Sequence, residues 1–210
     1  MTIHIRGVPA STCTIRVAVV LEELKVPYIL HIIDASRNEH KSPAHLEHQP
    51  FGQVPYIVDD ANDNFEVHGR ESGLIPGLAT GNIEALAKFE QAASTESANF
   101  DTYATGLAVE KIYKKKWGQQ PDESLAQTYA STLQAKLEGY ERILSKSKYL
   151  AGDSVSLADL FHLPYGNIAE QLLPGILTDE SQRPNVARWW KDITSRPTWL
   201  AVKDGITNTA

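Results

Sequence analysis

The hydrophobic pattern of this chain changes character once, in a link that contains glycine and proline at residues 73–81. Before the link, apolar runs of strand length alternate with one amphipathic helix, which begins after Ser11 and repeats apolar residues at i, i+3, i+4 and i+7. Strands are predicted over residues 3–8, 28–33, 54–58 and 65–68. A strand–helix–strand unit followed by a hairpin indicates a small mixed sheet with a right-handed crossover.

After the link the periodicity is helical. The longest apolar face consists of Leu125, Tyr129, Leu133, Leu137, Tyr140 and Leu144. A closing helix is predicted over residues 185–195. Ser156 and Asp159 have the spacing of a capping box at the start of another helix, so we interpret Asp159 as structural rather than catalytic.

Composition is typical of a soluble globular protein, with 42% hydrophobic and 22% charged residues among 210. The formal charge of −6 argues against nucleic acid or an anionic membrane as a partner. A single cysteine excludes an internal disulfide, and no signal peptide or membrane span is evident, so we expect a cytoplasmic protein. We expect two domains, an α/β domain over residues 1–80 and an all-α domain over residues 81–210.

Two short segments of the first domain contain candidate chemistry. Residues 9–14 (Pro-Ala-Ser-Thr-Cys-Thr) open the first helix and place the Ser11 hydroxyl beside the free amides of its first turn. Taken alone, Ser11 would be an ordinary helix N-cap. Residues 51–56 (Phe-Gly-Gln-Val-Pro-Tyr) put Pro55 at a strand entry, where a trans proline at a bend is the usual case.

The order of the motifs resembles that of cytosolic glutathione transferases, nearest the phi class and its fungal members. In the first domain the matching motifs are Ala-Ser-Thr-Cys-Thr with Arg16, His40-Lys41, Gln-Pro-Phe-Gly-Gln-Val-Pro and Glu71-Ser72. In the second they are Tyr-Leu-Ala-Gly-Asp-x-x-x-Leu-Ala-Asp-Leu and Arg-Pro-x-Val-x-Arg-Trp-Trp. The resemblance implies a thioredoxin-like first domain (βαβ-ββ), an all-helical second domain, a homodimer, and an electrophile pocket between the domains.

The resemblance further implies a detoxification enzyme that conjugates reduced glutathione to hydrophobic electrophiles, with Ser11 as the catalytic residue that stabilises the thiolate. Glutathione is then a co-substrate, and neither a bound cofactor nor a metal is expected. The implied glutathione-binding residues are Thr12, His40, Lys41, Gln53, Val54, Pro55, Glu71 and Ser72.

Each implied residue has an expected role. Glu71 and Ser72 hold the γ-glutamyl end of the tripeptide, and Gln53 offers amide hydrogen bonds. His40 and Lys41 supply positive charge near the glycyl carboxylate. A cis bond between Val54 and Pro55 exposes the Val54 backbone, which pairs with the cysteinyl residue like an added strand. The electrophile is expected near Val8, Thr12 and the helix around Phe100 and Tyr103.

Other interpretations stay open. Cys13 is a second candidate nucleophile, because thiol–disulfide relatives place a reactive cysteine where Ser11 stands, but we expect a buried, inert thiol. The histidines at 40, 45 and 48 lack acidic or sulfur ligands in helical register, which argues against a metal site. Two alternative functions are a non-catalytic ligand-binding or regulatory protein, and a glutathione-dependent peroxidase on the same site.

One departure from the family pattern follows Ser72. The family continues with a basic residue, small apolar residues and a full helix, whereas residues 73–81 here read Gly-Leu-Ile-Pro-Gly-Leu-Ala-Thr-Gly. A helix with its connection takes about 15 residues, and about that many are missing. We therefore expect the third helix of the first domain to be shortened or absent, since glycine and proline oppose helix formation.

Overall fold

The computed structural model describes residues 2–61, 65–68 and 83–208, which form two compact units. The first unit contains the described residues up to 68 together with 197–208, and the second contains residues 83–196. The expected domain boundary between residues 80 and 81 lies outside the described ranges. The sequence-based division assigned residues 197–208 to the helical domain, whereas the structure groups them with the sheet-containing unit.

A four-stranded sheet with the order β2-β1-β3-β4 forms the centre of the first unit. Its strands are β1 (Ile3–Gly7), β2 (Tyr28–Ile32), β3 (Tyr56–Asp59) and β4 (Phe65–His68). β1 runs parallel to β2 and antiparallel to β3, and β3 runs antiparallel to β4. The predicted mixed sheet is therefore confirmed.

Helix α1 (Thr12–Leu24) connects β1 to β2. Its middle is apolar and buried from Ile15 to Leu21, apart from the buried Arg16. The helix ends at Lys25, which has a left-handed backbone (φ 54°) and whose N–H donates to the Glu22 carbonyl. The helix therefore stops through its own C-cap, two residues before Pro27.

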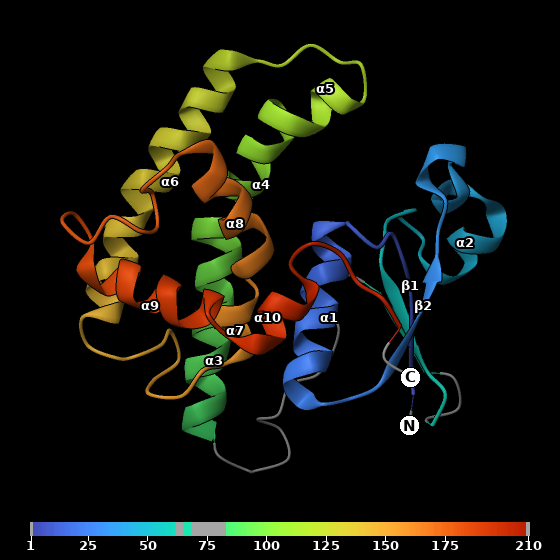
Figure 1. Cartoon of the computed structure of the whole chain (residues 1–210), viewed down its shortest axis with the longest axis horizontal. Helices are drawn as coiled ribbons and strands as arrows, with labels where there is room; N and C mark the ends of the chain where they lie inside the picture. The colour runs from blue at the N-terminus through green and yellow to red at the C-terminus, as the bar shows by residue number, and fades with distance from the viewer. Residues whose placement is uncertain (1, 62–64, 69–82, 209–210) are drawn as a thin grey trace. The chain divides into compact units, whose positions relative to one another are not determined.

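Short helical elements complete the first unit. After β2 the chain forms two 3₁₀ turns, η1 (Ala35–Arg37) and η2 (Glu39–Lys41), and the short helix α2 (Pro43–His48). A final helix, α10 (Pro197–Val202), lies beside α1 (Figure 1). The sequence analysis did not predict α10.

The second unit consists of helices and their connections within the described residues. A long helical stretch contains α3 (Ile83–Glu96), the π-helical η4 (Ser97–Asp101), α4 (Thr102–Ala108), the π-helical η5 (Val109–Tyr113) and α5 (Lys114–Lys116). It is followed by α6 (Glu123–Leu144), α7 (Leu157–Leu160), α8 (Leu163–Leu172) and α9 (Pro184–Thr194). The predicted all-helical domain is confirmed.

The predicted apolar face of α6 is correct over its C-terminal half only. Leu133, Leu137, Tyr140 and Leu144 are buried, but Leu125 is 37% exposed and Ala126 is buried in its place. A four-residue step advances about 40° around a helix of 3.6 residues per turn, so two such steps carry Leu125 roughly 80° away from Leu133. Apolar residues spaced four apart therefore rotate progressively away from the buried face of the helix.

Candidate functional site

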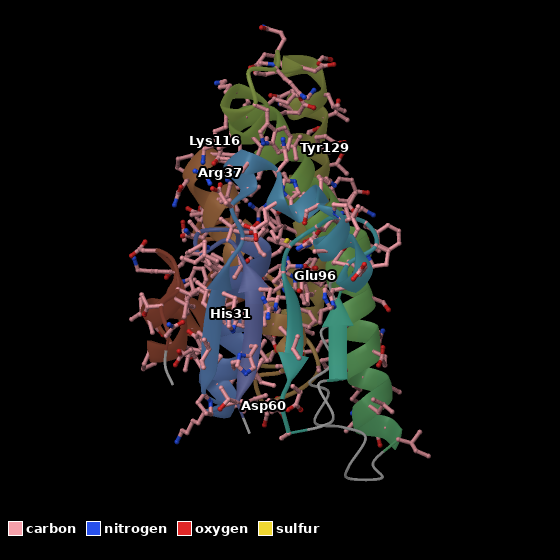
Figure 2. All side chains as sticks on the ribbon, turned by 90° about the vertical axis from the view of Figure 1, so that its right-hand side faces the viewer. His31, Arg37, Asp60, Glu96, Lys116 and Tyr129 are labelled. Carbon is pink, nitrogen blue, oxygen red and sulfur yellow. The ribbon has the colours of Figure 1, made fainter. Side chains whose placement is uncertain are left out.

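The loops that contain most of the implied site residues emerge at one end of the sheet. β1 ends at Gly7, and Arg6 pairs with Tyr56, the first residue of the antiparallel β3. The segment before β3 therefore reaches the sheet where β1 leaves it. Figure 2 shows this geometry: Asp60, which follows β3, lies at one end of the sheet, and Arg37, in the η1 turn after β2, lies at the other.

The β2 strand brings a third loop to the same end. β2 is parallel to β1 and finishes opposite Gly7, and the N–H of Ile33 donates to the Gly7 carbonyl at 3.0 Å. The η1 and η2 turns, which include His40 and Lys41, follow directly. Sheet topology thus gathers three loops that are separate in the sequence, as expected from parallel and antiparallel neighbours of one strand.

Ser11 occupies the N-cap position of α1 without capping it. Its backbone is extended (φ −72°, ψ 132°), its N–H donates to the Val8 carbonyl at 3.0 Å, and its own carbonyl accepts the first helical bond from Ile15 at 2.9 Å. The half-buried hydroxyl makes no cap hydrogen bond and has no partner within the described ranges. The alternative of an ordinary N-cap is therefore wrong, and the amides of the first turn remain available.

The peptide bond between Val54 and Pro55 is cis, which confirms the prediction. Within the part of the chain that the structure describes, the backbone N–H and carbonyl of Val54 have no hydrogen-bond partner. Pro55 is buried next to the start of α1: a Cβ atom added at Gly7 would lie 2.7 Å from Thr14 Oγ1 and 3.2 Å from Pro55 Cβ. A glycine at position 7 thus lets the helix opening approach the Val54–Pro55 segment closely.

Two buried side chains hold Gln53 in place. The Gln49 side-chain oxygen accepts from the N–H groups of Phe51 (2.9 Å) and Gln53 (3.2 Å). The His45 ring nitrogen Nε2 bonds to the Gln53 carbonyl at 2.8 Å. Gln49 is 1% exposed and His45 is 4% exposed, so the side-chain partner in each of the three bonds is buried.

Sequence reasoning missed these two positioning residues. In the sequence, His45 stands out only as a potential metal ligand, and Gln49 only as the first residue of Gln-Pro-Phe-Gly-Gln-Val-Pro. The only local signal for Gln49 is its position in front of a turn, where a side-chain acceptor can bind nearby amides.

Lys41 and His40 lie against the turn before Gln53. The Lys41 ammonium donates to the Phe51 carbonyl at 3.1 Å. Gly52 has a left-handed backbone (φ +60°), and a Cβ atom there would lie 2.9 Å from the His40 carbonyl oxygen. Glycine at position 52 is therefore required both by its backbone conformation and by the closeness of the two segments.

The surroundings of His40 determine the protonation state of its imidazole. Burial, with the positive charge of Lys41 and the nearby His45, lowers the pKa of His40 below its ordinary value. The imidazole is therefore neutral at neutral pH. This lowered pKa argues against His40 as the source of positive charge that the sequence analysis expected.

The remaining expectations concern three further glutathione-binding residues, the exposure of Cys13, and metal or membrane binding. Thr12 begins α1 next to Ser11, while Glu71 and Ser72 lie outside the described residues. The prediction of a buried Cys13 is wrong, because its side chain is half-exposed. Among the described residues no group of three or more His, Cys, Asp and Glu side chains is placed to hold a metal ion, and no helix is long and apolar enough to cross a membrane.

A small mixed sheet, with a serine at the mouth of its first helix and a cis-proline loop at the same end, precedes an all-helical unit. This combination defines the class of two-domain proteins in which a thioredoxin-like domain is followed by a helical one. Residues 10–75 match the family model of the glutathione S-transferase N-terminal domain, and residues 102–197 match that of the C-terminal domain.

Comparison with individual proteins gives the same family as the two family models. The chain is 41% identical over 202 residues to glutathione S-transferase PM239X14 of Arabidopsis thaliana, covering 90% of each chain. It is 35% identical over 212 residues to glutathione S-transferase hmp2 of Hypomyces subiculosus, covering 95% of this chain and 97% of the relative. The solved structure of maize glutathione S-transferase I, in complex with an atrazine glutathione conjugate, has a TM-score of 0.82 at 28% identity, with 96% of each chain covered. The chain belongs to the glutathione S-transferase family.

Proposed function

We propose that Ser11 stabilises the thiolate of bound glutathione and that the protein joins this sulfur to hydrophobic electrophiles. The protein is a glutathione S-transferase, and its reaction is glutathione conjugation. The observation that carries the role of Ser11 is its half-buried hydroxyl at the mouth of α1, with no partner among the described residues. A thiolate placed there accepts from the hydroxyl and from the first-turn amides, and it meets the positive end of the helix dipole.

The gain from ionising the sulfur is modest. A free thiol with a pKa of about 8.5 is only ~3% ionised at pH 7. Lowering the pKa by about two units, or about 2.7 kcal/mol, raises that fraction to roughly 75%. Nucleophilicity falls by a factor of roughly 8 over the same two units, so the net gain is about threefold. Positioning of the electrophile must supply the larger part of the rate enhancement.

Binding of the tripeptide is proposed to use the three loops at this end of the sheet. The unpaired Val54 backbone, held by the Val54–Pro55 bend, receives the cysteinyl residue as an added strand. Lys41 attracts the glycyl carboxylate, with the neutral His40 and the Gln53 amide as hydrogen-bonding groups.

Three further residues complete the proposed glutathione site. Thr12 contributes from the first turn of α1. Glu71 and Ser72 are proposed for the γ-glutamyl end on the basis of the motif alone, since they lie outside the described residues.

The acceptor is proposed to be an apolar electrophile. The maize relative named above, whose structure holds an atrazine glutathione conjugate, supports this class. Phe100, expected near the acceptor, is fully buried and packs against His162 with ring centroids 4.6 Å apart. Its side chain belongs to the core of the helical unit, so we do not include it among the acceptor contacts.

We also propose a cytoplasmic homodimer of the phi-class-like, fungal type, with a shortened or absent third helix in the first domain. The similarity to plant and fungal relatives supports the class. The glycines and proline in residues 73–81 support the short helix. Calorimetry with glutathione on the purified chain tests the consequence: micromolar to millimolar binding supports a formed site, and no detectable heat contradicts it.

The Ser11→Ala variant tests the catalytic assignment. The thiolate absorbance of bound glutathione is followed as a function of pH in the parent protein, in Ser11→Ala and in the surface control Ser181→Ala. We expect Ser11→Ala to raise the apparent pKa of the bound thiol by about one to two units and the control to leave it unchanged. An unchanged thiol pKa in Ser11→Ala refutes the role of Ser11.

The same variants address the two alternatives. A ligand carrier would retain glutathione without conjugating 1-chloro-2,4-dinitrobenzene. A peroxidase on the same site would reduce an organic hydroperoxide and lose that activity in Ser11→Ala, whereas loss only in Cys13→Ala would assign the chemistry to the thiol.

A further inference from the structure

The last described residues of the chain, 203–208, contact two earlier segments of the first unit, to which they belong. The N–H of Ile206 donates to the Pro9 carbonyl at 3.2 Å. The side-chain oxygen of Asn208 accepts from the N–H of Leu30, on the edge strand β2, at 2.7 Å. The first contact lies two residues before Ser11. We call residues 203–208 the C-terminal tail.

The tail is packed rather than loosely attached. In α10, which precedes the tail and contacts α1, Trp199 and Val202 are buried, and Ile206 is itself 4% exposed. Gly205 directs the tail: its N–H donates to the Val202 carbonyl at 3.0 Å, and its backbone has φ +125°, which strongly favours glycine. The chain therefore turns sharply after α10 and delivers the Ile206 N–H to Pro9.

Few contacts fix the direction of the Ser11 hydroxyl. Its side chain makes no cap bond, so its position follows from the backbone of the loop at residues 8–10. Within the described residues, two backbone hydrogen bonds hold that loop: the Ser11 N–H donates to the Val8 carbonyl, and the Ile206 N–H donates to the Pro9 carbonyl. The first is local to the loop. The second is contributed by a residue almost two hundred positions away.

We propose that Ile206, delivered by the Gly205 turn, is a positioning residue for the thiolate site. It acts through the Pro9 carbonyl and sets where the Ser11 hydroxyl points. This inference rests on the proposed role of Ser11. The Asn208 contact has a separate purpose: it occupies an N–H of the edge strand, which otherwise presents unpaired backbone groups.

The two contacts can be separated by substitution. Ile206→Pro removes the donor N–H to Pro9 while keeping an apolar side chain. Asn208→Ala removes the acceptor at the β2 edge and leaves the Pro9 contact in place, so it is the matched control. Gly205→Ala redirects the tail through its disfavoured backbone conformation, and it replaces Ile206→Pro if that variant does not fold.

The experiment measures the thiolate absorbance of bound glutathione against pH, together with kcat/KM for 1-chloro-2,4-dinitrobenzene, in the full chain. Misplacing a catalytic group by ~1 Å can cost on the order of a hundredfold, so loss of one of the two loop contacts should lower kcat/KM roughly tenfold. We expect Ile206→Pro also to raise the apparent pKa of the bound thiol by about half a unit, since the hydroxyl bond is weakened rather than removed. Asn208→Ala should leave the thiol pKa unchanged.

A purely structural role of the tail predicts a different result. In that case Ile206→Pro lowers the melting temperature but leaves the thiol pKa of the folded protein unchanged, and this outcome overturns the inference. Ser11→Ala is measured in parallel. If Ser11→Ala leaves the pKa unchanged, the proposed function fails. If Ser11→Ala raises it and Ile206→Pro does not, only the role of the tail fails.

Discussion

Asp159 offers the sharpest test of the distinction between a structural and a catalytic acid. Its carboxylate is fully buried and accepts four hydrogen bonds. One oxygen accepts from the Leu150 N–H (3.0 Å) and the Trp189 indole N–H (2.9 Å). The other accepts from the N–H and hydroxyl of Ser156, both at 2.8 Å. The carboxylate thus joins a turn, the start of α7 and the middle of α9.

The expected cost of Asp159→Ala follows from these bonds. Leu150 and Trp189 are buried, so both donors lose their partner without gaining water, at about 1–3 kcal/mol each. Loss of the bond to the Ser156 N–H at the helix start adds about 1 kcal/mol. We therefore expect the free energy of unfolding to fall by about 4 kcal/mol, which corresponds to roughly 8–16 °C in melting temperature for a chain of this size.

Urea and thermal unfolding measure this loss. Asp159→Asn should lie between the parent and Asp159→Ala, because one amide oxygen can still accept while the NH₂ group faces donors. The exposed Asp153→Ala is the matched control and should stay within about 0.5 kcal/mol of the parent. The reasoning is refuted if Asp159→Ala costs less than about 1 kcal/mol, or if it abolishes turnover without changing the unfolding free energy.

Three further predictions concern packing and charge. In Gly166→Ala, the new Cβ would lie 2.4 Å from the Trp190 ring, so we expect a loss of about 1–3 kcal/mol in urea unfolding. Gly139→Ala, in α6 with nothing within 4 Å of the added Cβ, should instead stabilise by about 0.5–1 kcal/mol. The lowered pKa of His40, caused by burial and the charge of Lys41, predicts an NMR titration midpoint below that of a free imidazole. Since the unfolded chain takes up the His40 proton first, stability should decline as the pH falls through about 6.5, and a midpoint at or above that value would contradict the assignment.

Much of the fold was predictable because local patterns are strong. Runs of apolar residues gave the strands at 3–7, 28–32 and 65–68 to within a residue, and the capping-box spacing gave the start of α7. The helix α10 was missed because its buried residues, Trp199 and Val202, are too few to show a period. Its helical form depends on packing against α1 rather than on propensity.

The candidate site was predictable where its residues are contiguous. Ser11 and the Val54–Pro55 bend belong to short motifs. The cis bond was implied by the family resemblance that these motifs carry, whereas the residues alone favoured a trans proline. Gln49 and His45 act through bonds to backbone groups, which any of several residue types could make, so neither has a pattern that identifies its role.

By itself the sequence determined the order of strands and helices, the family resemblance and the positions of the glycines and prolines that shape the turns. Only the tertiary structure decided that the Ser11 hydroxyl is left without a cap bond, that Cys13 is half-exposed, and that Ile206 reaches Pro9. The physical reason is the separation along the chain over which each effect acts. Propensity and periodicity act over a few residues, whereas exposure and long-range hydrogen bonds depend on which distant segments pack together, and that choice is made by the whole core at once.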